Sequence, residues 1–422
     1  MVDLKRSLSL WQLTVMSVGI ILGAGIYVIL GEAAGLSGNY IWLSFIIAAV
    51  VATLTAFSYA ELSSRFPKAG AEYVYVENSF GNRAAWLVAW LLLAGSVIGG
   101  ATVAMGFAQY FSVIFHTPII AIALIMLVII IIILIIGVQQ TAKITILFTA
   151  VEIAGLVIVI FIGIPYIGSV NYFEAAQGLK GVIEAGVLIF FGYLGFEGIT
   201  RLAEETKNPE KNIPKAIMYS MIITTVFYIL VGISAVSVIP WQELATARAP
   251  LALVAQRVFG EQSFLILSVI ALFSTFNTAL MMLLTGSRLI YGIAQQEAIP
   301  KFFTMVGKRL RTPWIAIITI VVASMFFLFL GDLKTIANLT NFTIFSVFIV
   351  INASVIYFRY KKPITTGFRV PFHVGKFPVI PFLGIVTSIF MIANLTYDVL
   401  LLGLLLIVIG FIVDSILNLK YK

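Results

Sequence analysis

The chain has 422 residues, of which 61% are apolar and only 10% are charged. Soluble domains are about half apolar and about a quarter charged, so this composition excludes soluble enzymes, coiled coils and secreted disulfide scaffolds. The net charge of +8 is a possible sign of a nucleic-acid partner, and in so apolar a chain it must first be tested as a signal of membrane topology.

Charge-poor windows separated by polar clusters predict about twelve membrane-spanning helices. A crossing needs about 20 mostly apolar residues, and the stretch between Arg83 and Lys143, which contains no Asp, Glu, Lys or Arg, fits two of them. In chain order the predicted helices are 10–32, 40–62, 84–112, 118–138, 144–167, 181–202, 216–239, 262–292, 313–330, 335–359, 378–396 and 399–417. These windows are apolar on every face, which excludes barrel strands of alternating polarity. We therefore expect an all-α integral membrane protein with one domain over residues 1–422.

The first window begins like a signal peptide, with Lys5 and Arg6 followed by apolar residues from Leu8. It has no persuasive small-residue cleavage site and stays apolar to about Leu30, so we interpret it as a retained first span.

The basic residues predict the orientation of these spans. With both termini in the cytoplasm, 22 of the 26 Lys and Arg residues fall on the inside. The four on the outside are Lys180, Arg248, Arg257 and Lys334. This bias is what the positive-inside rule predicts for a multi-pass protein of the cell membrane. The basic excess therefore reports topology, and we expect no nucleic-acid partner.

Two predicted spans are interrupted by glycine, which costs about 1 kcal/mol per helix-interior position relative to alanine. The glycines are Gly19, Gly23 and Gly25 in the first span and Gly186, Gly192 and Gly195 in the sixth. Small residues also mediate close helix packing, which is the alternative for Gly19 and Gly23. Two such spans five helices apart indicate inverted repeats around a central site. The repeats would cover 10–167 and 181–359, with two further helices over 378–417.

Several long motifs resemble those of the amino acid–polyamine–organocation (APC) transporters. They are Gly23-Ala-Gly-Ile-Tyr27, Phe57-Ser-Tyr-Ala-Glu-Leu-Ser-Ser-Arg-Phe-Pro-Lys-Ala-Gly-Ala-Glu-Tyr-Val-Tyr75, Phe190-Phe-Gly-Tyr-Leu-Gly-Phe-Glu197, Ala203-Glu-Glu-Thr-Lys-Asn-Pro-Glu-Lys-Asn-Ile-Pro-Lys-Ala-Ile217, Ser287-Arg288, Ile299-Pro300 and Arg311-Thr-Pro313. The resemblance covers the first ten helices in order. It implies a LeuT-type fold, helices 1 and 6 broken at mid-membrane, and secondary transport of amino acids or related amines.

A broken helix exposes N–H groups that suit a carboxylate and carbonyl groups that suit an ammonium. The resemblance implies that a substrate carboxylate lies against the amides of Gly23, Ala24 and Gly25. The substrate amino group would meet carbonyls near Ile21, Phe191 and Leu194. Phe190 and Phe191 are expected at the same site, with Phe191 either an aromatic gate or a packing residue. Ser96, in a small-residue stretch of the third helix, either borders the substrate or packs against another helix.

Carboxylates inside spans are costly and are candidates for function. Glu197, just beyond the break in helix 6, is predicted either to couple protonation to opening or to be a structural carboxylate. Glu152 lies where some proton-coupled relatives hold a lysine, so the lysine mechanism does not transfer. It is either a proton carrier or a fixed countercharge.

Ser274 and Asn277 in helix 8 either border a cation position or bond to backbone. Glu61 and Glu205 are predicted to close an inner gate through ion pairs, the alternative being solvated loop charges.

Other classes of protein lack their signatures in this chain. It has no cysteine, and His116 and His373 fall in loops predicted on opposite sides, so they cannot share a metal. Motifs of membrane enzymes and ATP-driven pumps are absent from the sequence, and paired broken helices favour alternating access over a channel. We expect no cofactor and no metal.

The sequence thus predicts a secondary transporter in the lipid bilayer with a small-molecule substrate. Proton-coupled uptake of neutral or apolar amino acids leads, with co-transported protons as partners. Exchange of cationic amino acids or polyamines is the alternative, and an oligomer stays possible.

Overall fold

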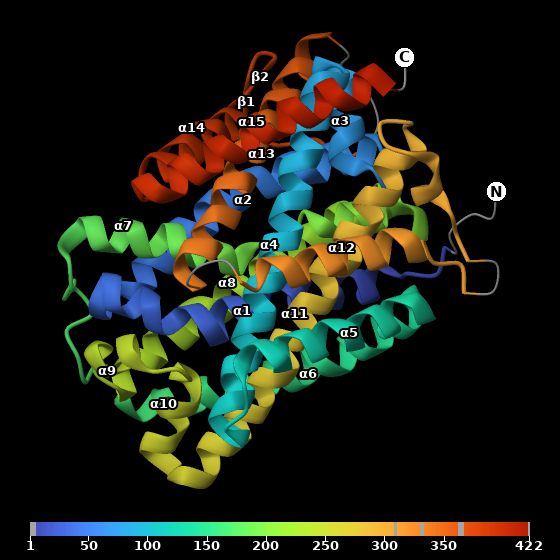
Figure 1. Cartoon of the computed structure of the whole chain (residues 1–422). Helices are drawn as coiled ribbons and strands as arrows, with labels where there is room; N and C mark the ends of the chain where they lie inside the picture. The colour runs from blue at the N-terminus through green and yellow to red at the C-terminus, as the bar shows by residue number, and fades with distance from the viewer. Residues whose placement is uncertain (1–5, 308–309, 330–332, 362–366, 421–422) are drawn as a thin grey trace.

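The computed structural model describes residues 6–307, 310–329, 333–361 and 367–420, apart from the side chains of Ala24, Leu333 and residues 417–420. Over these residues the chain is almost entirely helical (Figure 1). The prediction of an all-α protein is therefore confirmed.

Each of the twelve predicted spans coincides with a helical segment. The segments are α1 Leu10–Ser37, α2 Ile41–Arg65, α4 Asn82–Phe115, α5 Ile119–Ile136, α6 Val138–Gly163, α7 Gly178–Ile189 with the 3-10 turns η3 Phe190–Tyr193 and η4 Gly198–Glu205, α8 Pro209–Val238, α11 Glu261–Gln295, α12 Trp314–Phe327, α13 Leu333–Lys361, α14 Val379–Ala393 and α15 Tyr397–Lys420. Among the described residues, nine stretches are long and apolar enough to cross a membrane, and one of them runs through both α1 and α2. The helices α12 and α14 are apolar but shorter.

Several short elements were not predicted, because they are too short or too polar to stand out as spans. They are α3 Ala71–Phe80, α9 Trp241–Thr246, α10 Pro250–Phe259, the 3-10 turns η1 Gly38–Tyr40, η2 Ile164–Tyr166 and η5 Lys301–Thr304, and a hairpin of β1 His373–Val374 and β2 Phe377–Pro378. Local signals do mark the two ends of α10. Pro250 lies in its first turn, and Gly260, with a φ of +80°, follows its last residue.

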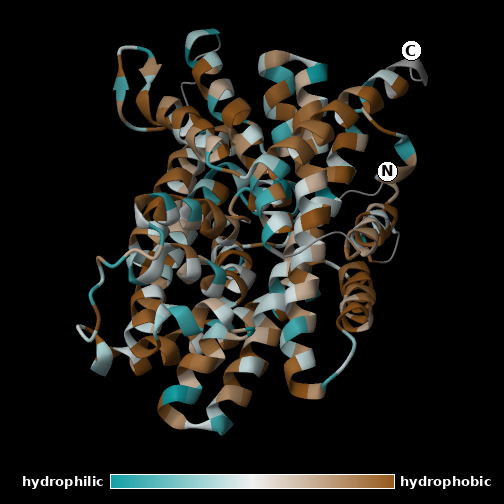
Figure 2. Ribbon diagram, turned by 60° about the vertical axis from the view of Figure 1, so that its left-hand side comes forward, coloured by the Kyte–Doolittle hydropathy of each residue, from teal (hydrophilic) through white to brown (hydrophobic). Residues whose placement is uncertain are grey.

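The helices differ in how much of their surface other helices cover. The most apolar 18-residue window of each span shows this difference. In the α7 segment 89% of this window is buried inside the protein, whereas the buried share is 28% in α5 and 17% in α15. Apolar residues, in brown, run along most of the helices in Figure 2, including those at the sides of the molecule. Exposed apolar flanks on α5 and α15 need a hydrocarbon solvent, so the fold is that of a multi-pass membrane protein.

Long-range polar contacts join residues that the topology assigns to the same side. Glu61, Arg201, Arg288 and Arg359 all belong to buried ion pairs at one end of the bundle, which we call the basic face. At the opposite face, Glu174 accepts hydrogen bonds from Asn39 and Trp241. In Figure 1, α9 and α10 lie at this opposite end, far from α3. The alternation of sides predicted from the sequence is thus consistent with the packing.

Candidate functional site

The first helix is interrupted at Gly23, which has φ −55° and ψ −116° within an otherwise helical segment. Thr278 of α11 fills the space beside this residue. A Cβ atom at Gly23 would collide with the Thr278 side chain and would lie 3.0 Å from the carbonyl oxygen of Ser274. The Thr278 hydroxyl donates to the carbonyl of Ile20, 3.3 Å away, so it bonds a backbone group next to the break.

The sixth span is interrupted over a longer stretch. The helix α7 ends at Ile189, tightens into η3, and becomes extended at Leu194 (φ −64°, ψ 141°). Gly195 then takes a φ of +123°, which L side chains rarely adopt, and a Cβ there would meet Ile20. The chain continues as the eight-residue 3-10 segment η4. The predicted breaks in both spans are therefore present.

The two breaks touch each other through glycine. A Cβ atom at Gly25 would overlap the Cα of Gly192, so neither position has room for a larger residue. Beside this contact the hydroxyl of Tyr228 is placed to donate to two carbonyls, those of Ile21 and Gly192. A phenol has one proton, so Tyr228 can donate to only one of the two carbonyls at a time. The other carbonyl can then accept from another hydrogen-bond donor at the site.

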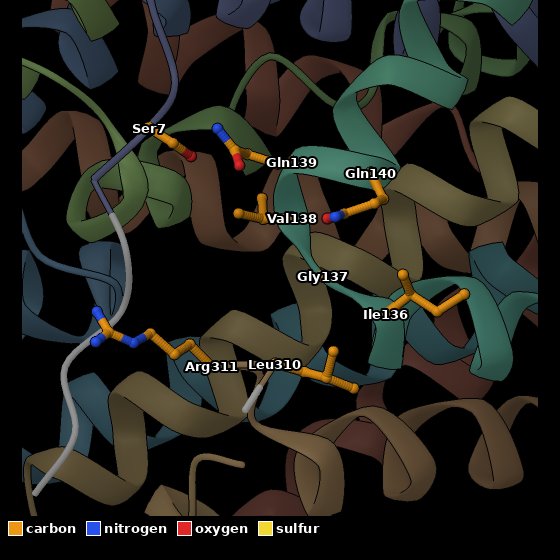
Figure 3. Close-up of a pocket in the computed structure, with 8 residues that line it drawn as sticks. All are labelled: Ser7, Ile136, Gly137, Val138, Gln139, Gln140, Leu310 and Arg311. Carbon is orange, nitrogen blue, oxygen red and sulfur yellow. The ribbon is translucent and has the colours of Figure 1, made fainter. Parts of the chain in front are cut away.

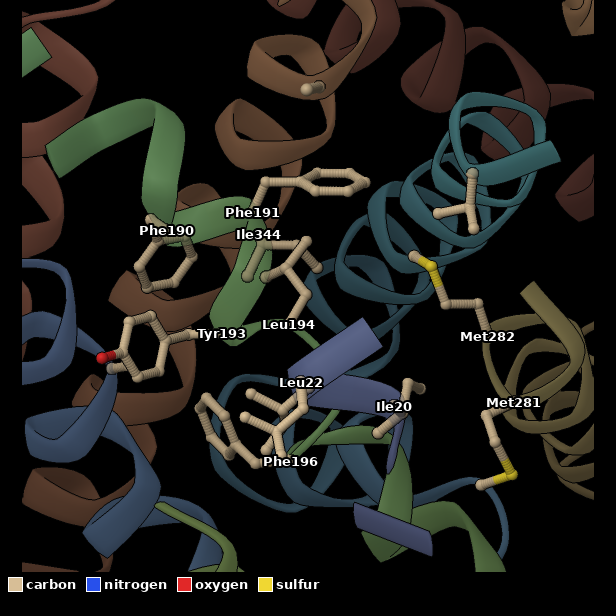
Figure 4. Packing of buried hydrophobic residues seen from close by; sticks show 14 of the residues in the cluster. Ile20, Leu22, Phe190, Phe191, Tyr193, Leu194, Phe196, Met281, Met282 and Ile344 are labelled. Atoms are coloured by element: carbon tan, nitrogen blue, oxygen red, sulfur yellow. The ribbon is translucent and has the colours of Figure 1, made fainter. Parts of the chain in front are cut away.

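The other predicted substrate residues occupy different surroundings. Phe191 and Leu194 are each 4% exposed next to the break, near Met282 and Ile344 (Figure 4). Phe190 instead packs against Phe345, with ring centroids 4.3 Å apart. Its ring therefore contributes to an aromatic core.

Two further residues of this predicted set are less informative. The Ser96 hydroxyl donates to the carbonyl of Leu92 at 2.9 Å, so its own helix already satisfies it. Ala24 lies in α1, and its side chain is outside the described residues.

Glu152 lies fully buried on α6, and neither of its carboxylate oxygens has a hydrogen-bond partner among the described residues. The side chains of Ser274 and Asn277 on α11 face it. The Ser274 hydroxyl and the Asn277 amide oxygen also lack partners within the described part of the chain. The Asn277 amide nitrogen donates to Thr149 at 3.1 Å, which orients that oxygen. Four buried oxygens that have no hydrogen-bond partner in the described part of the chain thus gather between α6 and α11, beside the first helix.

Glu197 is bound differently from Glu152. One of its oxygens accepts a 2.9 Å hydrogen bond from the backbone N–H of Gly195. The carboxylate therefore caps the turn that forms the break in the sixth span.

Glu61 belongs to a buried network at the basic face. Arg359 of α13 donates to both of its oxygens, from Nε at 3.0 Å and from Nη2 at 2.5 Å. The backbone N–H of Val370 donates to the same carboxylate at 2.7 Å, and the Val370 carbonyl accepts from Arg359 at 3.2 Å. Glu61 thus joins α2 to α13 and to the loop that follows α13.

Two more buried ion pairs hold η4. Arg288 of α11 donates to both oxygens of Glu205 at 3.1 and 2.9 Å. Arg201, also in η4, donates to Glu72 of α3 at 2.8–3.1 Å. All four side chains are at most 3% exposed. The half of the sixth span at the basic face is therefore held to α3 on one side and to α11 on the other.

Backbone hydrogen bonds tie the chain before α1 to the end of η4. The N–H of Leu8 donates to the Glu205 carbonyl, and the N–H of Lys207 donates to the Leu8 carbonyl, both at 2.9 Å. The start of the first broken helix and the end of the second are thus joined at the basic face.

Comparison with known proteins assigns this arrangement to a family. The family model described as amino acid permease matches residues 8–410. The chain belongs to the amino acid permease family. This membership agrees with the APC resemblance of the motifs and makes the protein a transporter of small molecules.

Individual relatives have different named substrates. The permease is 27% identical to the branched-chain amino acid permease BcaP of Bacillus subtilis, over all of this chain and 94% of the relative. It is 31% identical to the methylthioribose transporter of the same organism, over 90% of this chain and 87% of the relative. It is 28% identical to the vacuolar cationic amino acid transporter 4 of Arabidopsis thaliana, over 86% of this chain and 64% of the relative.

Sequence reasoning missed several residues of the permease's site. Arg201 and Arg359 were counted only for topology and Arg288 was otherwise noted only within a family motif, although each lies within or at the end of a predicted span, where a charge signals a partner. Glu72 was placed in a loop. Nothing in the local pattern of α8 marks Tyr228, because its partners come from two other helices.

A separate pocket of about 370 Å³ lies at the basic face of the permease (Figure 3). It is lined by Ser7, by the corner between α5 and α6, and by Leu310 and Arg311. It lies away from the breaks, and its described lining includes none of the predicted substrate residues, so it is distinct from the central site.

Proposed function

We propose that this permease is a secondary active transporter that moves amino acids across the cytoplasmic membrane by alternating access, with the basic face in the cytoplasm. The observation that carries this proposal is the contact between the two broken spans at Gly25 and Gly192. Unsatisfied backbone groups cannot face lipid, but they can line a substrate site. The carboxylate would bind the amides that begin the outer half of α1, around Gly23, Ala24 and Gly25. The ammonium would bind the carbonyl that Tyr228 leaves free.

Neutral, apolar amino acids are the substrates that the surroundings favour. Phe191, Leu194, Met282 and Ile344 offer apolar contacts next to the break. The carboxylates of Glu61, Glu72 and Glu205 are neutralised by arginines at the basic face. The similarity to the branched-chain amino acid permease of Bacillus subtilis supports this class of substrate.

Cationic amino acids are the second candidate, and one observation favours them. Glu152 is a buried carboxylate without a partner among the described residues, and relatives from Arabidopsis thaliana are named cationic amino acid transporters. A positive side chain of a substrate would have to reach this carboxylate past α1.

We propose further that Glu152 carries the coupled proton and that Ser274 and Asn277 position it. An ionised carboxylate buried without a donor is costly, so the site favours its protonated form until a conformational change admits water. Glu61 and Glu205 would hold the inner gate closed, and their arginine pairs would have to separate for release.

Purified protein in liposomes tests this proposal. Uptake of labelled leucine, alanine, arginine and methylthioribose is compared with and without an imposed pH gradient, and with and without internal amino acid. Leucine uptake that rises with an inward proton gradient is the expected result. Uptake that does not depend on the pH gradient but requires internal amino acid would establish exchange of one amino acid for another. Uptake of methylthioribose alone would overturn the amino acid assignment.

A further inference from the structure

The loop between α13 and α14 ends in an exposed hairpin at the basic face. In this hairpin β1 pairs antiparallel with β2, His373 opposite Pro378 and Val374 opposite Phe377, and Gly375 makes the turn with a φ of +59°. Figure 2 shows the hairpin projecting at the edge of the molecule, outside the helical bundle. Because it directly precedes the span α14, it lies near the surface of the bilayer.

Two apolar side chains on this hairpin are turned away from the protein. Phe372 is 75% exposed and Val374 is 74% exposed. Phe372 also has a φ of +55°, a conformation that is rare and strained for a bulky residue. Its carbonyl accepts a hydrogen bond from the N–H of Val379 at 3.1 Å, which holds the strained turn to the start of α14. The turn therefore directs an aromatic ring outward, where water would be an unfavourable solvent.

The same segment carries positive charge only. Lys361, Arg369 and Lys376 are exposed, and no Asp or Glu occurs in the sequence between Asp332 and Asp398. Basic residues around apolar ones at the end of a span match the chemistry of an anionic leaflet.

We propose that this hairpin anchors the protein in the headgroup layer of the leaflet at the basic face. Phe372 and Val374 enter the boundary with the acyl chains, and Arg369 and Lys376 bind the phosphates of anionic lipids. A protein strand is a poorer occupant, because each strand of the hairpin has only two residues and offers few backbone groups for pairing.

The anchor is linked to the bundle through Val370. The backbone of this residue contacts both Glu61 and Arg359, so the loop that carries the hairpin is bound to the inner end of α2. Anionic lipid held by the hairpin therefore restrains the loop that contacts the proposed inner gate.

Site-directed spin labelling tests the anchor, since the chain has no native cysteine. A nitroxide on Val374→Cys is compared in vesicles of pure phosphatidylcholine and in vesicles that also contain phosphatidylglycerol. Gln296→Cys, which lies in an exposed loop, is the aqueous control, and Val386→Cys, on an exposed face of α14, is the bilayer control. The measurement is accessibility to oxygen relative to a water-soluble nickel complex.

We expect the accessibility of the label at Val374 to shift from the Gln296 value toward the Val386 value when phosphatidylglycerol is present. The change Arg369→Ser with Lys376→Ser should abolish this shift while leaving the Val386 label unchanged. A Val374 label that matches Gln296 in both kinds of vesicle would overturn the anchor. A label that becomes immobilised in detergent as protein concentration rises would indicate a second copy and would also overturn it. Neither readout requires transport, so the anchor and the proposed function fail separately.

Discussion

The hydroxyl of Tyr228 lies between the main-chain carbonyls of Ile21 and Gly192, one from each broken span. This residue of α8 thereby joins two breaks that are far apart in the sequence. Its single phenol proton can serve only one of the two carbonyls at a time. An ammonium group has three protons and would satisfy the remaining carbonyl. In the proposed site, substrate binding would therefore depend on the distance between the two breaks.

The substitution Tyr228→Phe should slow uptake without unfolding the protein. The ring stays packed, but the two carbonyls lose the one phenol proton that they share, at a cost of about 1 kcal/mol for the lost hydrogen bond. Uptake per molecule of protein in liposomes measures the effect. Tyr219→Phe is the matched control, because Tyr219 lies on the exposed side of the same helix. Full uptake by Tyr228→Phe would remove the hydroxyl from the transport cycle.

The substitution Gly25→Ala should abolish substrate binding. The added Cβ would overlap the backbone of Gly192, and separating the two breaks should cost about 1–3 kcal/mol. Binding is measured by the thermal stabilisation that added amino acid gives to the purified protein. Gly307→Ala should leave that stabilisation intact, because the nearest described atom beyond its chain neighbours, the Thr312 carbonyl oxygen, is 3.8 Å from the added Cβ. Retained affinity in Gly25→Ala would contradict a site at this contact.

The substitution Glu152→Gln should uncouple transport from the proton gradient. A glutamine cannot release a proton, so uptake should no longer rise with the gradient, while exchange of internal for external amino acid should continue. Glu184→Gln, at a partly exposed position of α7, should keep the wild-type response. Glutamate at this buried position must either take up a proton or bury a charge, and glutamine needs neither, so we also expect a higher unfolding temperature.

Breaking the pair between Arg201 and Glu72 should destabilise the protein strongly. Removal of one partner leaves a buried charge uncompensated, which costs about 3–5 kcal/mol, whereas removing both costs far less. Unfolding temperatures of Arg201→Met, Glu72→Met and the double variant measure this coupling. The exposed pair of Lys180 and Glu184, 3.6 Å apart, is the comparison and should contribute less than about 1 kcal/mol. Additive losses at the buried pair would refute the clamp on η4.

The sequence by itself predicted the twelve helical segments and the positions of both breaks. Hydrocarbon demands a long apolar segment at each crossing, so each span is written in its own stretch of sequence. Gly23 and Gly195 mark their breaks locally, because each fits a backbone position where a side chain would be strained or would collide. The family motifs are likewise contiguous. The inverted relation of the two repeats stays a prediction.

Only the tertiary structure decided which polar groups meet. Glu61 pairs with Arg359, almost 300 positions away, and Tyr228 finds its acceptors on two other helices. The sequence singled out Glu61 and Glu205 but not their arginines, and it gave no sign that Glu72 is buried. A charge or hydroxyl in a span indicates that a partner exists elsewhere in the protein, because the hydrocarbon of the bilayer provides none. The identity of that partner depends on how the helices pack, so it cannot be predicted from the neighbouring residues in the sequence.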